Sequence, residues 1–212
     1  MQRFVASIIL LLSLAGTAEL ASATPITLTH SSSGLSLNGQ IELLEDDGGQ
    51  LSIADMADPA VQRRFQPANG RATVGQSRNP WWIKVSLQRT PDAPAQWWLE
   101  VGAVTPLDLQ LYLADGQAGW QARQSGERTG FAHGRDHPYR RMLFKLPTLG
   151  SEPQTIYLRS YDPAGNSFPL KAWQLDDLNL LASQENLGLG VVYGMIAALL
   201  LYNLFIFFSL RD

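Results

Sequence analysis

The 212-residue sequence contains no cysteine and only three histidines. Without cysteine the protein has no disulfide bond, thiol nucleophile or thiolate metal ligand, so an exported domain must be held together by burial alone. The histidines form no H-E-x-x-H or H-x-H motif. We expect His133 and His137 to be solvent-facing side chains of a loop rather than metal ligands. We therefore predict no metal site and no cofactor.

Charged residues are also scarce, at 17% of the chain, and the formal net charge is -3. Nucleic-acid binding requires a basic patch that pairs with phosphates. A slightly acidic chain gives no reason to expect one, so no nucleic-acid partner is predicted.

Signatures of catalysis are equally sparse. The acidic turn Glu45–Gly49 lacks the alternating ligands and the terminal Glu of an EF-hand, and the serines at 31–33 lack a nucleophile-elbow pattern. Glu100 and Asp108 both point away from the predicted core, as a glycosidase pair would, but surface carboxylates are common on strands. We predict no catalytic residue in this chain.

The first 23 residues have the pattern of a signal peptide. Arg3 supplies a positive start, Val5–Leu14 is apolar, and residues 21–23 read Ala-Ser-Ala, a small-residue cleavage site. The apolar stretch is too short to span a bilayer comfortably. We therefore expect the mature chain to begin near Thr24, outside the cytoplasm.

The longest hydrophobic run lies near the other end, where residues 187–210 carry no formal charge. As a helix this segment would extend about 36 Å, enough to cross a bilayer core of about 30 Å. Acidic residues precede it and Arg211 follows it, so the positive-inside rule places residues 211–212 in the cytoplasm and the preceding domain outside.

The predicted span has more than apolar length. Gly190, Gly194 and Ala198 recur at four-residue spacing, and Asn203 is an amide within the span. Small residues allow close helix approach, and a membrane-embedded amide favours a partner on another helix. We predict a helix that packs against other transmembrane helices or a second copy of the chain.

Residues 24–174 show mostly period-two patterning. The segments WWIKVSLQ, WWLEVG, LDLQLYL, RMLFKLP and TIYLRSY alternate apolar and polar residues and are separated by Pro/Gly turns. Weaker strands are expected near 26–30, 35–44 and 168–173, and a helical interruption is expected after Ser52 and again at Asp58-Pro59. The pattern predicts a mostly β, antiparallel jelly roll or β-sandwich. Residues 175–186 read as an amphipathic connector into the membrane.

Aromatic side chains fall on the polar faces of several strands. A flat ring covers apolar CH surface while polar neighbours donate and accept hydrogen bonds, an arrangement that suits sugars and similar small polar ligands. The alternative is that these rings pack under loops or form cross-strand pairs. The candidate ligand-binding residues are Trp82, Trp98, Glu100, Tyr112 and Arg159, with Tyr157, Tyr161 and Lys84 nearby on the same strand faces.

Six segments carry a resemblance to known proteins: IELLEDDGGQLSIADM, NPWWIKVSLQ, WWLEVGAVTPLDLQLYLADG, RRMLFKLP, TIYLRSYD and GVVYGMIAALLLYNLFIFFSLRD. Together they resemble one bacterial receptor family, the 7TMR-DISM proteins (seven-transmembrane receptors with diverse intracellular signalling modules). The similarity covers the type-2 extracellular sensor domain, about residues 26–174, and the first membrane helix. It implies a carbohydrate-binding-like jelly roll outside the inner membrane. It also implies seven helices and a cytoplasmic output module, commonly a diguanylate cyclase or a histidine kinase.

This chain departs from the family pattern because it has one predicted span and no output module. It is therefore expected to be a fragment, a truncated product, or one piece of a system whose remainder lies elsewhere. The family fixes no ligand, so no site residue is taken from it.

We expect the periplasmic ligand-sensing portion of a bacterial inner-membrane signalling receptor, not itself an enzyme. The alternatives are a membrane-tethered carbohydrate-binding or scaffold protein without signalling and an exported glycan-active enzyme.

Overall fold

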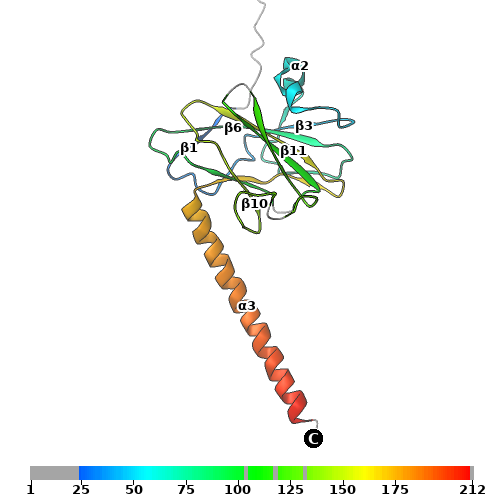
Figure 1. Ribbon diagram of the computed structural model, residues 1–212, viewed down its shortest axis with the longest axis vertical. Helices are drawn as coiled ribbons and strands as arrows, with labels where there is room; N and C mark the ends of the chain where they lie inside the picture. The colour runs from blue at the N-terminus through cyan, green and yellow to red at the C-terminus, as the bar shows by residue number, and fades with distance from the viewer. Residues whose placement is uncertain (1–23, 103–104, 117–118, 131–132, 211–212) are drawn as a thin grey trace, which may run out of the picture.

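The computed structural model describes residues 24–102, 105–116, 119–130 and 133–210. Two β-sheets face each other, and a long helix runs away from them toward the C-terminus (Figure 1). The predicted signal peptide and the predicted cytoplasmic end at 211–212 lie outside the described residues.

The large sheet runs in the order β4-β3-β6-β11-β8-β9, and β1 pairs in parallel with β6. Its other pairings are antiparallel. Its strands are β1 (Ile26–Leu28), β3 (Glu42–Glu45), β4 (Gln66–Pro67), β6 (Trp81–Arg89), β8 (Asp108–Ala114), β9 (Trp120–Ser125) and β11 (Gln154–Tyr161).

The small sheet runs β10-β7-β13-β2, all antiparallel. It comprises β2 (Leu35–Ser36), β7 (Trp98–Val101), β10 (Met142–Lys145) and β13 (Leu170–Trp173), and a separate ribbon pairs β5 (Thr73–Gly75) with β12 (Asn166–Ser167). The predicted antiparallel β-sandwich is therefore confirmed. The expected strand at 35–44 is two strands, one in each sheet.

The main core lies between the sheets and follows the period-two pattern. Ile83, Val85 and Leu87 of β6 are buried there, and they meet Leu99 and other inward residues of the small sheet. Because side chains alternate across a strand, the intervening residues face outward on both sheets. Other segments of the chain pack on part of each outer face, and they limit which outward side chains a ligand can reach.

The outer face of the large sheet is covered by the helical interruption, η1 (Ile53–Ala57) and α2 (Pro59–Gln62). The backbone N–H of Ser52 donates to Asp55 Oδ2 at 2.8 Å, and that of Ala60 donates to Asp58 Oδ1 at 2.7 Å. Both predicted helix starts are confirmed, since these contacts satisfy donors that a first turn leaves free.

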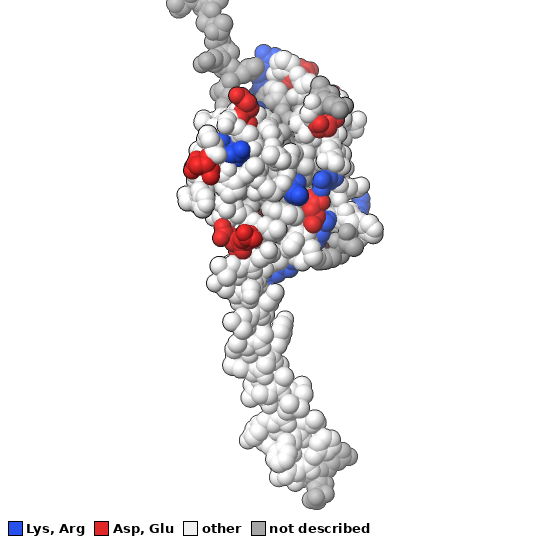
Figure 2. Space-filling view, turned by 60° about the vertical axis from the view of Figure 1, so that its left-hand side comes forward, with Lys and Arg blue, Asp and Glu red and all other residues white. Residues whose placement is uncertain are grey.

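The last element, α3, is one continuous helix, Leu175–Ser209, of 35 residues. The predicted connector and most of the predicted span therefore form a single continuous helix. It is the helix among the described residues that is long and apolar enough to cross a membrane. Figure 2 shows charged side chains over the domain, whereas the visible surface of the helix below it is uncharged.

Candidate functional site

The predicted ligand-binding residues lie on opposite sides of the sandwich. Trp82, Tyr112 and Arg159 project from β6, β8 and β11 on the outer face of the large sheet. Trp82 stacks on Tyr112 with ring centroids 5.6 Å apart, and Arg159 pairs in register with Trp82. Trp98 and Glu100 belong to β7, on the outer face of the small sheet. The five residues therefore do not form one site.

The group on the large sheet is largely covered. Trp82 is fully buried in a second core with Met56 and Val61 of the helical interruption and Phe65 just after it, and Tyr157 packs with them. A ligand would reach the Trp82 ring only by displacing that interruption. Of the predicted neighbours, Lys84 is held by Glu42 at 2.8 Å.

The group on the small sheet is engaged with the helix. Trp98 packs with Leu143 and Trp173 against Leu178 of α3, which is buried. Leu175, Leu181 and Ala182 join the same cluster. These positions recur every three or four residues and therefore share one face of α3.

A polar cluster extends this contact, and we call it the junction: Glu100, Tyr139, Arg140, Arg141 and Glu185. The Glu100 carboxylate is buried, at 5% exposure, and accepts from Trp173 Nε1 at 2.7 Å and from Arg141 Nη1 at 3.1 Å. The same Arg141 donates through Nη2 to Glu185 Oε1 of α3 at 3.0 Å. One guanidinium thus joins a strand of the domain to the helix.

Glu185 has two further partners. Tyr139 donates its hydroxyl to Glu185 Oε2 at 2.7 Å, and Arg140 forms an ion pair with the same carboxylate. The Tyr139 hydrogen bond, with help from the two arginines, lowers the pKa of Glu185, whereas burial raises the pKa of Tyr139. At neutral pH the carboxylate is ionised and the phenol is neutral, which are the forms these contacts need.

The sequence patterns assigned Trp98 and Glu100 to a ligand and did not show that Arg141 pairs with Glu185. The three- and four-residue spacing from Leu175 to Glu185 was the available signal. It predicted an amphipathic connector, but a period alone does not show which surface the apolar face will meet.

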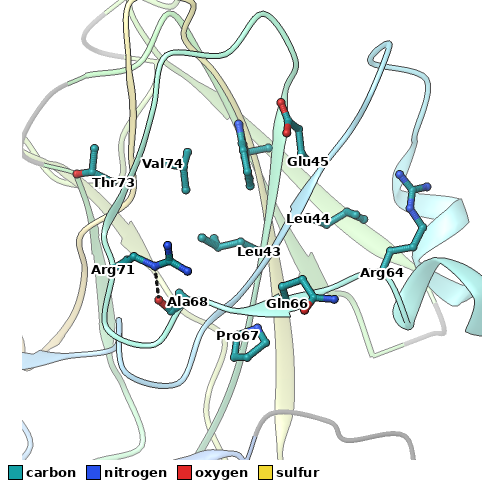
Figure 3. A pocket seen from close by; sticks show the side chains of 11 residues that line it. Leu43, Leu44, Glu45, Arg64, Gln66, Pro67, Ala68, Arg71, Thr73 and Val74 are labelled. Atoms are coloured by element: carbon teal, nitrogen blue, oxygen red, sulfur yellow. Dashed lines mark hydrogen bonds between the residues drawn. The ribbon is translucent and has the colours of Figure 1, made fainter.

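A pocket with a volume of about 550 Å³ lies at the edge of the large sheet (Figure 3). Its lining mixes aliphatic side chains, Leu43, Leu44 and Val74, with polar ones, and Arg64 and Arg71 lie on opposite sides. Trp81 also lines it and is only half-buried, although the alternation placed this ring in the core. Trp81 is the first residue of β6 and packs against the main core while staying partly exposed.

The predicted helix-packing residues lie along α3, outside the contact with the domain. Gly190, Gly194, Ala198 and Asn203 are exposed, and a Cβ built at either glycine meets nothing within 4 Å. Asn203 Nδ2 donates to its own helix at Leu199 O, 2.8 Å away. Its carboxamide oxygen remains available to a neighbouring helix. Packing of α3 against another helix stays a prediction.

Together these features define an extracellular β-sandwich domain docked on an apolar helix. The chain matches a family model over residues 38–174, described as 7TMR-DISM extracellular 2. That match covers more than half of the chain, which therefore belongs to this family, and the suspected resemblance is confirmed. A search of the curated proteins found no match. Family and helix together make this a membrane protein with an N-terminal extracellular domain.

Proposed function

We propose that this chain is the ligand-sensing portion of a bacterial inner-membrane signalling receptor, with its β-sandwich in the periplasm. The junction is the observation that carries the proposal. A passive tether needs no specific contact between domain and helix, whereas here Arg141 connects buried Glu100 of β7 to Glu185 of α3.

Such a contact suits signal transmission for a physical reason. A ligand shifts an equilibrium only if it binds two arrangements of the domain with different affinity. A change in β7 or β10 would move Glu100 or Arg141, and the helix would follow because its first turns are packed on the same sheet. The exposed small residues of α3, Gly190, Gly194 and Ala198, would then pass the change to other transmembrane helices or a second copy of the chain.

The ligand we propose is a carbohydrate or similar small polar molecule. The pocket in Figure 3 supports this, because its lining includes Trp81 and aliphatic side chains, which suit the CH face of a sugar. Arg64, Arg71 and Gln66 supply polar groups around it. A diguanylate cyclase or histidine kinase output would belong to a longer parent protein, and this chain itself is proposed to have no enzymatic activity.

The test uses the full chain in lipid nanodiscs with a dye on Leu187→Cys, a unique thiol in a sequence without cysteine. Glucose, galactose and N-acetylglucosamine are the probes. We expect one of them to bind by calorimetry and to change the dye emission saturably. In Arg141→Met the binding should remain and the emission change should vanish.

Val74→Trp should fill the pocket and abolish binding, whereas Val191→Trp on the lipid-facing helix is the matched control. Failure of all three sugars to bind would contradict the carbohydrate ligand. An emission change that survives Arg141→Met would contradict transmission through the junction.

A further inference from the structure

A second pocket, of about 310 Å³, lies where the loops before β6 and after β9 approach the ends of β8 and β11. Its lining includes Arg78, Arg128 and Arg159, together with Asp108 and Tyr161. Asp108 and Tyr161 are paired across neighbouring strands, so the sheet itself fixes their separation. The arginines come from three segments far apart in the sequence.

The charge of this pocket is opposite to that of the whole chain. Three arginines and one carboxylate line it, and a second carboxylate, Asp46, lies 3.8 Å from Arg159, so positive charge is in excess here in a protein whose formal net charge is -3. In the described part of the chain, no hydrogen bond or ion pair engages the side chains of Arg78 and Arg128. Like charges gathered in this way repel one another, and an anion from solution would relieve that repulsion.

Arg159 is the most buried of the three and is incompletely satisfied. Its Nη2 lies 3.8 Å from Asp46 Oδ2 and 3.5 Å from Gly49 O, both long contacts. Its Nε is buried and has no hydrogen-bond partner among the described residues. Buried charged donors without good partners are costly, so this guanidinium has unused capacity for an oxyanion.

We propose that this pocket binds a sugar acid, with the carboxylate held by the arginines. Guanidinium groups match carboxylates in a two-point geometry. Tyr161 offers a ring face for the CH surface of the sugar. Asp108 accepts one hydrogen bond on each oxygen, from Gln110 and Gln124, which leaves lone pairs for ligand hydroxyls.

The mixed lining distinguishes this ligand from a bare anion. Inorganic sulfate or phosphate would leave Tyr161 unused and would be repelled by Asp108, whereas a sugar acid satisfies both and still brings a negative charge. The volume lies at the lower end of the range for small-molecule sites, which suits a single sugar ring.

The test is calorimetry on the full chain in zwitterionic nanodiscs, with glucuronate and galacturonate as probes against glucose, galactose and sodium sulfate. We expect a uronate to bind at least about tenfold more tightly than its neutral sugar and to weaken as salt rises. Arg78→Gln and Arg128→Gln should each weaken binding by about tenfold or more, the effect of losing one charge-assisted hydrogen bond. Arg63→Gln, an exposed arginine outside this pocket, should leave it unchanged.

Three results would each overturn the assignment. They are that no uronate binds, that sulfate binds as tightly as a uronate, or that Arg63→Gln weakens uronate binding as much as Arg78→Gln and Arg128→Gln do. Circular dichroism on every variant separates lost binding from lost folding. The result is independent of helix coupling, because binding is measured directly. If this pocket binds no uronate, the proposed sensing function is not thereby contradicted, since it is tested separately with neutral sugars and the Leu187→Cys dye.

Discussion

Replacing Arg141 by Met tests the junction most specifically. Methionine keeps an unbranched apolar stem but removes the charge and all the donors, so Glu100 would keep only the Trp173 hydrogen bond. Removing one partner of a fully buried pair costs about 3–5 kcal/mol. Here the Glu100 side chain is 7% exposed but that of Arg141 is 25% exposed, so we expect a loss of about 2–3 kcal/mol after this partial solvation is taken into account.

The assay is urea unfolding of the full chain in detergent micelles, followed by tryptophan fluorescence. Arg140→Met is the matched control, since the ion pair of Arg140 is with Glu185 and not with buried Glu100, and the Arg140 side chain is 46% exposed. Such exposed pairs contribute about 0.2–1 kcal/mol. The double variant Glu100→Gln/Arg141→Met should recover part of the loss, because it no longer buries an unpaired charge. Equal effects of Arg140→Met and Arg141→Met would refute this reasoning.

The packing and the charges give four further predictions. Leu178→Ala, at a position 1% exposed, should cost about 2–5 kcal/mol of domain–helix docking, measured as increased hydrogen exchange in the first turns of α3. Acidification should loosen the same turns of α3. Because folding lowers the pKa of Glu185, its carboxylate stabilises the docked helix above the ordinary Glu pKa of about 4.3, and this stabilisation is lost as the pH falls through the pKa of the folded state. Hydrogen exchange measured across that pH range checks this. Trp82→Ala should destabilise the domain by about 3–5 kcal/mol in urea unfolding, and an unchanged stability would contradict the place of this ring in the second core. Gly194→Leu should weaken helix association in membranes without changing domain stability, as cross-linking and unfolding would show.

The sandwich was predictable because burial between two sheets imposes a period of two on the sequence. Ile83, Val85 and Leu87 follow that period and lie in the core. Trp81, the first residue of β6, follows it too but is half-buried. The helix starts at Ser52 and Asp58 were predictable because capping depends on local residues.

The candidate site was harder to predict because alternation says only that a side chain faces outward. Trp82 and Trp98 do so, but Met56 and Phe65 cover the first and Leu178 covers the second. Which segment folds back over an outer face depends on contacts between residues distant in sequence. Of the arginines of the second pocket, Arg159 was among the predicted ligand-binding residues, whereas Arg78 and Arg128, which lie in loops, were missed for the same reason.

The junction and the apolar cluster around Leu178 hold the domain on α3, and the proposed transmission depends on this contact. Spin labels on Glu152→Cys in the domain and Leu187→Cys on the helix, in the full chain in nanodiscs, measure this directly as a distribution of distances. We predict one narrow distribution that broadens in Arg141→Met and in Leu178→Ala. A broad distribution already present in the parent, or one that neither substitution changes, would contradict the account.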